Sequence, residues 1–345
     1  MIFVDELIPL LHNRLALVEP ITTFAGRTLT RQMLIDNDAH ALFVRSTTPV
    51  NADLLRGTNV RFVGTASVGT DHVDLNWLAY QDIEFASAPG SNAWAVVEYV
   101  YAWMLVLGYQ PSATVGIVGH GNIGMRLEGV LRSAGYHTIV YDPPKLGHTK
   151  QVLSTLLETA DVVSLHVPLT HGGMHATHGM IGETEISRMK QSSTLIQASR
   201  GGVLTDAALM HAVQSNRVTA VLDVYETEPN VARELVEVVT HCTPHIAGHS
   251  IDAKLRGASM IVDAYLAFIA GQRVGEIGGT ATSAYSLQPN KVSAQSSLVL
   301  RDVVAEAQWF RSEYLQDPSA ITFDALRKAY KPQPEMLRIQ LDVDA

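Results

Sequence analysis

The stretch TVGIVGHGNIG, residues 114–124, runs from a short apolar segment into the glycine pattern G-x-G-x-x-G. A helical pattern follows over 125–134, and a second apolar run over 138–141 ends at Asp142, 18 residues after Gly124. A strand, a glycine turn, a helix and a second strand that ends in an acid are typical of the dinucleotide-binding unit of doubly wound sheets. The sequence therefore predicts a domain of this kind.

The glycine turn has the residue types that a pyrophosphate needs. The first glycine allows a tight turn, the second leaves room for phosphate to approach the backbone, and the third lets the helix pack closely on the strand. The free N–H groups at the helix N-terminus attract phosphate. Asp142 is expected to accept hydrogen bonds from ribose hydroxyls and to repel a 2′-phosphate, which favours NAD over NADP. The cofactor residues expected in the turn are Gly119, Gly121, Asn122, Ile123 and Gly124.

Short apolar runs alternate with helical patterns on both sides of this turn. Strands are expected over 2–4, 41–44, 61–65, 114–118, 138–141, 161–166, 193–197 and 219–224. Helices are expected between them, notably over 30–36, 51–55, 92–109 and 252–270. This alternation predicts an α/β protein with two doubly wound parallel sheets. After Gly271 the composition shifts to the Gly-, Ser- and Thr-rich stretch 278–297, which favours a linker, before a helix over 303–314 and a strand over 336–341.

Composition excludes several classes of protein. The 345 residues carry a formal net charge of −9, which argues against a nucleic-acid partner. Apolar residues make up 47% and charged residues 17%, typical of a globular chain with a real core. The single cysteine, Cys242, excludes an internal disulfide framework and a cysteine-clustered metal site. Acidic Asp5 and Glu6 replace the basic start of a signal peptide, and the longest apolar stretch, 99–107, is too short to cross a bilayer. We expect a cytoplasmic protein without a membrane or metal partner.

Three polar side chains follow successive predicted strands beyond the glycine turn. Arg200 lies in ASRGG, Glu228 in LDVYETEP and His245 in TPHIAG. Because the carboxyl ends of strands line the ligand crevice in such sheets, these groups are expected to converge. A guanidinium can bind a carboxylate through bidentate hydrogen bonds, and an imidazole can accept a hydroxyl proton. A neighbouring carboxylate can orient that imidazole. Oxidation of a 2-hydroxy acid by hydride transfer needs this combination.

These residues together resemble the D-isomer-specific 2-hydroxyacid dehydrogenase family. The resemblance covers about residues 1–272 and includes VRSTTPVN (44–51), GTASVGTDHVD (64–74) and APGSNAWAVVEYV (88–100). It implies a discontinuous flavodoxin-like substrate domain over 1–92 and 250–272, a Rossmann NAD domain over 93–249, and a small C-terminal α+β dimerisation segment over 273–345 that makes the protein a homodimer. It implies a catalytic set of Arg200, Glu228 and His245. It implies NAD contacts from Asp142, Ala198, Ser199, Asp223 and Gly248. Substrate contacts are implied for Ser46, Thr65, Arg200 and His249.

Within the family, GTDHVD, HIAGHSIDAKLRG and FDALRKAY (323–330) resemble the members whose substrate is a small phosphorylated hydroxy acid. Such members usually have a tyrosine where this chain has His249 and a threonine where it has Val167. These two departures bear on substrate preference rather than on reaction type. Two alternative functions stay open. One is another D-2-hydroxyacid dehydrogenase, of the phosphoglycerate or glyoxylate and hydroxypyruvate type, and the other is a non-catalytic NAD-sensing module.

Three further clusters are interpreted as structural. His171, His175 and His178 are spaced as metal ligands could be, but the glycines among them favour a polar loop. The acids and histidine in 71–74 are typical of a turn and helix cap. The basic residues Arg327, Lys328 and Lys331 favour a solvated face, with a contact to substrate phosphate as the alternative.

Overall fold

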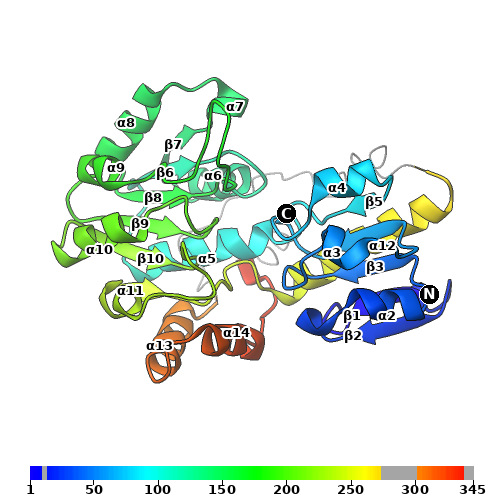
Figure 1. The fold of residues 1–345 in the computed structure, drawn as a ribbon. Helices are drawn as coiled ribbons and strands as arrows, with labels where there is room; N and C mark the ends of the chain where they lie inside the picture. Colours follow the sequence, from blue (N-terminus) through cyan, green and yellow to red (C-terminus); the bar gives the residue numbers. More distant parts are fainter. Residues whose placement is uncertain (10–13, 273–300, 338–345) are drawn as a thin grey trace. The chain divides into compact units, whose positions relative to one another are not determined.

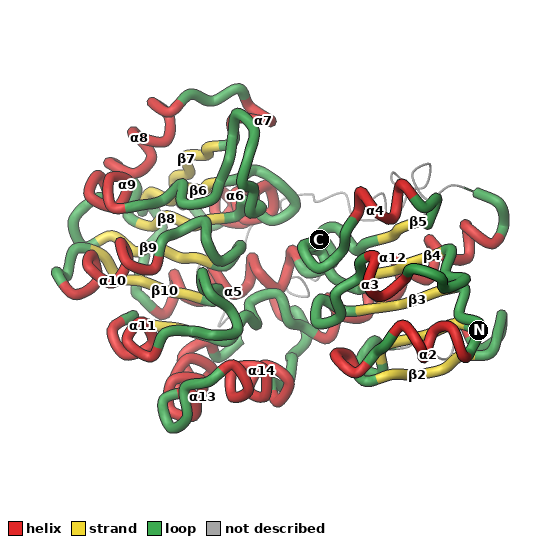
Figure 2. Tube along the Cα trace, in the orientation of Figure 1, coloured by secondary structure: helices red, strands yellow, loops and turns green. Residues whose placement is uncertain are grey.

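The computed structural model describes residues 1–9, 14–272 and 301–337. Within these ranges the chain forms two compact units, one of residues 1–92 and 250–272 and one of residues 93–249 and 301–337. Figure 1 shows that each unit is a sheet with helices on its faces, and Figure 2 shows the alternation of strand and helix along the chain. The α/β class with two parallel sheets is therefore confirmed.

The first unit contains a five-stranded sheet in the order β2-β1-β3-β4-β5, with every pair parallel. This is the flavodoxin-like order. Its strands are β1 (Ile2–Asp5), β2 (Ile21–Phe24), β3 (Ala41–Val44), β4 (Phe62–Thr65) and β5 (Glu84–Ala86). The sequence predicted the three central strands and missed both edge strands. Edge strands pair on one side only, and these two are partly exposed, so neither has the continuous apolar run that marks a buried strand.

Helices of the first unit cover this sheet. They are α2 (Arg31–Asp36), α3 (Ala52–Leu55), α4 (Leu75–Tyr80) and α12 (Ile251–Ile269), with a 3-10 turn over Gly26–Thr28. The interpretation of 71–74 as a cap is confirmed, because Asp74 accepts the N–H of Trp77 at 3.0 Å and begins α4. Tyr265 of α12 packs edge-on against Phe43 and Phe62 of the sheet. The return of the chain at residue 250 thus completes the core of the unit that the first 92 residues begin.

The second unit contains a six-stranded parallel sheet in the order β11-β10-β9-β8-β6-β7. Its strands are β6 (Thr114–Val118), β7 (His137–Tyr141), β8 (Val162–Leu165), β9 (Ser193–Gln197), β10 (Val218–Leu222) and β11 (His241–Cys242). Its helices are α5 (Ala93–Val106), α6 (Gly124–Ser133), α7 (Pro143–Leu146), α8 (Lys150–Thr159), α9 (Glu183–Arg188), α10 (Asp206–Gln214), α11 (Arg233–Val238), α13 (Val303–Tyr314) and α14 (Ala320–Ala329). Five strands were expected, and the sixth, β11, has only two residues.

Helix α5 is apolar on all sides because it is buried on all sides: every residue from Ala93 to Met104 is buried. Its one charged residue, Glu98, accepts the backbone N–H of Arg301 at 3.4 Å and that of Leu337 at 3.0 Å. The lone carboxylate of this helix therefore holds the C-terminal segment to the unit.

The C-terminal segment packs on the second unit where it is described. Phe310, Tyr314 and Phe323 lie in one core cluster with Tyr225 and Cys242. The linker expected over 278–297 lies outside the described residues. The strand expected over 336–341 is not found at its described start, because Met336 and Leu337 are helical. The amide of Leu337 bonds a side chain on α5 rather than a neighbouring strand, so the apolar pattern there reflects burial against a helix.

Candidate active site

The glycine turn between β6 and α6 has the geometry that a dinucleotide needs. A Cβ on Gly119, whose φ is +98°, would lie 2.4 Å from the carbonyl oxygen of His166. A Cβ on Gly124 would lie 2.0 Å from the carbonyl oxygen of Gly119. At Gly121, in contrast, a Cβ would meet no atom of the described residues within 4 Å, so the backbone is open on that side. The first and third glycines are thus required by the fold, and the second leaves space for a phosphate.

Asp142, at the end of β7, stands beside this turn. Its Oδ2 accepts the N–H of His120 at 2.7 Å, and its Oδ1 accepts the N–H of Lys145 at 3.0 Å as the cap of α7. The Lys145 ammonium donates to the carbonyl oxygen of His120 at 3.1 Å. The carboxylate therefore lies next to the phosphate turn, where an acid that binds ribose is expected. Within the same turn, Asn122 is exposed and Ile123 packs partly buried at the start of α6.

Arg200 follows β9 and is positioned by a glutamine that the sequence analysis did not single out. Buried Gln197 accepts the N–H and the hydroxyl of Ser199 at 3.2 and 2.8 Å, and it donates to the carbonyl oxygen of Arg200 at 2.9 Å. The Arg200 side chain is partly buried and donates to the carbonyl oxygen of Ser199 at 2.8 Å. Ala198, just before it, is buried. One amide side chain thus shapes the whole segment 197–200.

Glu228 and His245 form a pair, as the sequence predicted that their positions would allow. Oε2 of Glu228 lies 2.7 Å from Nδ1 of His245, and its Oε1 accepts the N–H of Tyr225 at 2.9 Å. Because a carboxylate only accepts, Nδ1 carries the proton and Nε2 is the nitrogen that can take another. Burial alone raises the pKa of the Glu228 carboxyl, but His245, the Tyr225 amide and Arg327 of α14 outweigh it, so the pKa lies below its usual range.

The backbone of His245 is left-handed, with φ of +57°, which costs a non-glycine residue roughly 1–3 kcal/mol. Asp223, at the end of β10, offsets this by binding the loop beyond it. Its Oδ1 accepts the N–H of Ile246 at 2.7 Å and the Thr243 hydroxyl at 2.7 Å, and its Oδ2 accepts the N–H of Ala247 at 2.9 Å. Burial raises the pKa of Asp223 to about 6, although His245, Thr243 and the two amides act in the opposite direction.

The remaining candidate residues lie in two places. Gly248 and His249 continue the loop after His245, and the His249 ring stacks on that of Tyr330 with centroids 6.3 Å apart. Ser46 and Thr65 belong to the first unit, just after β3 and at the end of β4, which are neighbouring parallel strands. Ser46 is exposed. Buried Thr65 lies 2.6 Å from the Ser67 hydroxyl and 3.0 Å from Nε2 of His72.

Two groups at this site escaped the sequence analysis. One is Gln197, a buried amide at a strand end. The other is Arg301, which donates to the loop after His245 from the C-terminal segment. The sequence did contain a signal that the C-terminal segment, which carries Arg301, packs here. Glu98 is the single charged residue of an apolar helix, and a buried charge needs partners that the local sequence does not supply. Nothing in the sequence around Arg301 names the loop that it contacts.

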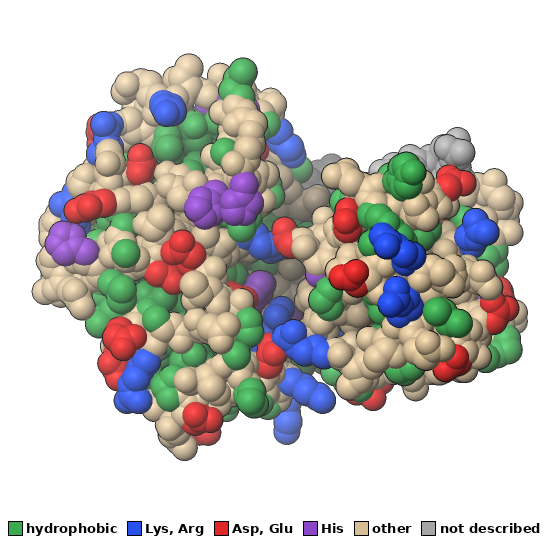
Figure 3. Space-filling model, viewed as in Figure 1, with side chains coloured by type: hydrophobic (Ala, Val, Ile, Leu, Met, Phe, Trp, Pro, Cys, Tyr) green, Lys and Arg blue, Asp and Glu red, His purple; other side chains and the backbone are tan. Residues whose placement is uncertain are grey.

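The histidines of 171–178 lie in a loop, as expected. The rings of His171 and His178 are 4.7 Å apart and exposed, and Figure 3 shows histidine side chains gathered on the surface of the second unit. Among the described residues, no group of three or more histidine, cysteine or acidic side chains is placed to hold a metal ion. In the same ranges, no helix combines the length and hydrophobicity required to cross a membrane.

Comparison with known proteins gives one consistent answer. Residues 106–247 match the family model described as "D-isomer specific 2-hydroxyacid dehydrogenase, NAD binding domain". The chain is 43% identical over 278 residues to the erythronate-4-phosphate dehydrogenase of Proteus mirabilis, covering 78% of this chain and 74% of that one. It is 39% identical over 374 residues to the enzyme of the same name from Azotobacter vinelandii, covering 100% and 96%.

Solved structures share the fold at lower sequence identity. D-lactate dehydrogenase from Aquifex aeolicus, complexed with NAD and lactic acid, superposes with a TM-score of 0.61 at 24% identity over 81% of this chain and 97% of that one. NAD-dependent formate dehydrogenase from Staphylococcus aureus, in complex with NAD, gives a TM-score of 0.65 at 22% identity over 79% and 96%. At these identities the likeness concerns the fold.

Proposed function

The chain belongs to the D-isomer-specific 2-hydroxyacid dehydrogenase family, and we propose that it oxidises 4-phospho-D-erythronate to 2-oxo-3-hydroxy-4-phosphobutanoate with NAD, in pyridoxal phosphate biosynthesis. Relatives named erythronate-4-phosphate dehydrogenase support this substrate, and one of them matches over the whole of this chain. The observation that carries the chemistry is the 2.7 Å contact between Glu228 and Nδ1 of His245. An NAD-sensing module has no use for a histidine held as a base.

The residues of the second unit have distinct tasks in this proposal. The turn and the strand ends would hold NAD through Gly119, Gly121, Asn122, Ile123, Gly124, Asp142, Ala198, Ser199, Asp223 and Gly248. When bound, NAD supplies the acceptor for the hydride that leaves C2 of the substrate. Arg200 would bind the substrate carboxylate through its planar fork, in the orientation that exposes the C2 hydrogen.

His245 would act as the general base. As the C2–H bond breaks, the C2 hydroxyl loses its proton to Nε2, and the C–O bond becomes a carbonyl. Glu228 keeps the proton on Nδ1 and stabilises the positive imidazolium that results. The depressed pKa of Glu228 keeps its carboxyl ionised over the neutral range, which this task requires.

Residues outside the catalytic set and the cofactor site would contact the substrate and form the homodimer. We assign substrate contacts to Ser46, Thr65 and His249, and the substrate-domain role to residues 1–92 and 250–272. We further propose a cytoplasmic homodimer with residues 273–345 as the dimerisation segment, supported by the likeness of FDALRKAY to the tail of such enzymes. Light scattering of the purified chain tests the dimer, since a monomeric mass would contradict it.

The test of the function is a steady-state assay of NADH formation with a panel of acids. We expect 4-phospho-D-erythronate to be preferred over phosphoglycerate, glycolate and D-lactate. A phosphate-free acid preferred by about tenfold in kcat/KM would reject the proposed substrate but keep the reaction class. Binding of NAD with no NADH formed in a single turnover, with every acid, would instead indicate a sensor.

A further inference from the structure

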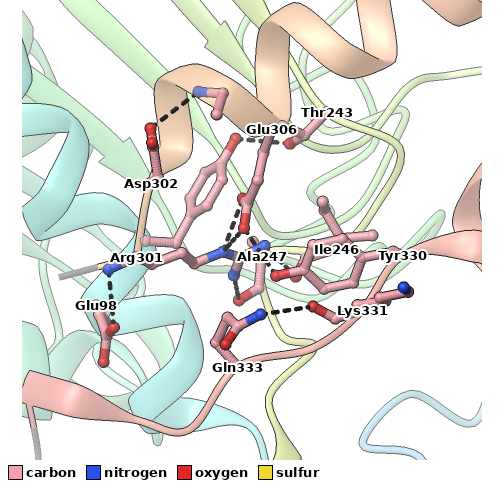
Figure 4. A network of polar contacts seen from close by, with 12 residues as sticks. Glu98, Thr243, Ile246, Ala247, Arg301, Asp302, Glu306, Tyr330, Lys331 and Gln333 are labelled. Atoms are coloured by element: carbon pink, nitrogen blue, oxygen red, sulfur yellow. Dashed lines mark hydrogen bonds and ion pairs between the residues drawn. The ribbon is translucent and has the colours of Figure 1, made fainter.

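Arg301 lies in the C-terminal segment, outside the range that the family model matches, and its side chain is only 6% exposed. Its Nε donates to both carboxylate oxygens of Glu306, at 2.7 and 2.8 Å. Its other two nitrogens donate to the loop that follows His245. Nη1 bonds the carbonyl oxygen of Ala247 at 3.0 Å, and Nη2 bonds that of Ile246 at 2.9 Å (Figure 4).

Asp223 holds the N–H groups of the same stretch. It accepts those of Ile246 and Ala247 at 2.7 and 2.9 Å. Asp223 and Arg301 together therefore bind the successive peptide groups 245–246, 246–247 and 247–248. The carboxylate of Asp223 accepts hydrogen bonds from the amides, and the guanidinium of Arg301 donates hydrogen bonds to the carbonyls. Neither residue can therefore replace the other.

The loop needs this support because His245 is left-handed. Such a backbone persists in a residue other than glycine only where the surrounding structure fixes it. On the basis of the proposed function, we infer that Arg301 is a positioning residue of the reaction: it fixes the carbonyls after His245 and so keeps Nδ1 on Glu228 and Nε2 toward the substrate.

Two aromatic rings lie against the guanidinium. Arg301 lies over the Tyr99 ring at 5.3 Å and over the Tyr330 ring at 5.2 Å. The Tyr330 hydroxyl donates to Glu306 at 2.8 Å, and its ring also stacks on His249. The C-terminal segment thus contacts the loop at both Arg301 and Tyr330. Lysine could pair with Glu306, but its single nitrogen cannot reproduce a planar fork that donates to two carbonyls and lies over two aromatic rings.

The test compares Arg301→Lys and Arg301→Gln with Arg311→Lys. Arg311 is a matched control, since it lies in the same segment and donates to the backbone carbonyls of Val239 and Thr240, outside the 245–249 loop. Turnover is measured per mole of folded enzyme, with NAD and 4-phospho-D-erythronate, below the Tm of each variant. We expect both Arg301 variants to lose about 10- to 100-fold in kcat while both KM values change by less than about threefold.

Arg311→Lys should keep kcat within about twofold of the wild type, even where its Tm falls. Deuterium exchange at the amides of Ile246 and Ala247 should be about tenfold faster in the Arg301 variants and unchanged in the control. Should Arg301→Gln fail to fold, Arg301→Lys decides alone. The inference is overturned by an Arg301→Lys enzyme with kcat within about twofold of the wild type, or with unchanged exchange at the two amides.

Failure of the proposed function gives a different result. In that case the wild type either oxidises no hydroxy acid or prefers another one, and the exchange measurement still decides whether Arg301 fixes the loop.

Discussion

Oε2 of Glu228 lies 2.7 Å from Nδ1 of His245, although the two residues leave the sheet after different strands, β10 and β11. If this pair is the general base, His245→Ala should lower kcat by about 10²- to 10⁴-fold and change NAD affinity by less than about threefold. Glu228→Gln should lower kcat by a smaller factor, because it removes the charge but not the imidazole. Stopped-flow NADH formation and calorimetric titration with NAD measure the two quantities.

Glu226→Gln is the control for that experiment, because Glu226 accepts the N–H of Asp206 and not a proton of His245. It should leave turnover near the wild-type value. Full activity in His245→Ala would show that the base is another residue.

Arg200→Lys should act mainly on substrate binding. The lysine keeps the positive charge but loses the planar pair of donors, so the substrate KM should rise by about 10- to 100-fold with a smaller change in kcat. Arg217→Lys is a suitable control, since Arg217 donates to backbone carbonyls of 186–189. An unchanged KM in Arg200→Lys would contradict the assignment.

The glycine turn allows fold and cofactor binding to be separated. Gly121→Ala adds a methyl that contacts none of the residues that the structure describes, so Tm should hold while NAD affinity falls by about tenfold or more. Gly124→Ala places its methyl 2.0 Å from the Gly119 carbonyl oxygen and should destabilise the fold by about 1–3 kcal/mol or more. Thermal unfolding and NAD titration of both variants test this contrast, and equal effects on Tm would refute it.

Asp142→Ala should weaken the preference for NAD over NADP, by about tenfold in the ratio of kcat/KM values, since the charge that repels a 2′-phosphate is removed. It also removes the cap of α7, at about 1 kcal/mol of stability. Asp142→Asn separates the charge from the cap, because its one amide oxygen can still accept the N–H of Lys145, while the hydrogen bond from the N–H of His120 is lost with the charge. A preference for NAD that survives in both variants would mean that another group selects the cofactor.

Asp206, at the start of α10, has a pKa raised to about 6, first by burial and then by the charge of Glu226. The helix N-terminus favours its charged form but is outweighed. The folded chain holds this proton more tightly than the unfolded chain, so the contribution of Asp206 to stability falls as pH rises from about 4 to about 6.

Asp206→Asn should therefore raise Tm, relative to the wild type, more at about pH 8 than at about pH 4. Glu226→Gln should also raise Tm more at about pH 8 than at about pH 4, but by less, because it removes only the charge repulsion and leaves Asp206 buried. Thermal unfolding across this range measures the difference, and a shift that is the same at every pH would disprove the account.

Residue patterns along the chain predicted the local elements and the class of reaction. The alternation of buried strands and helices predicted both parallel sheets, and G-x-G-x-x-G with Asp142 predicted the cofactor turn. Arg200 and Glu228 could be chosen because each follows a predicted strand, and His245 because it comes next along the chain; parallel strands bring their carboxyl ends to one edge. The edge strands β2 and β5 were missed because half-exposed strands lack an apolar run.

The distant groups that support this site could be identified only from the folded structure. The hydrogen bonds from the amides of Ile246 and Ala247 to Asp223, and those from Arg301 to the carbonyls of the same two residues, join segments far apart in the chain. The pattern of apolar and polar side chains indicates which face of a helix or strand is buried, but not which other element packs against that face. Hydrogen bonds to backbone groups depend on where the backbone lies, and any residue type can supply that backbone, so they leave no signature in the sequence.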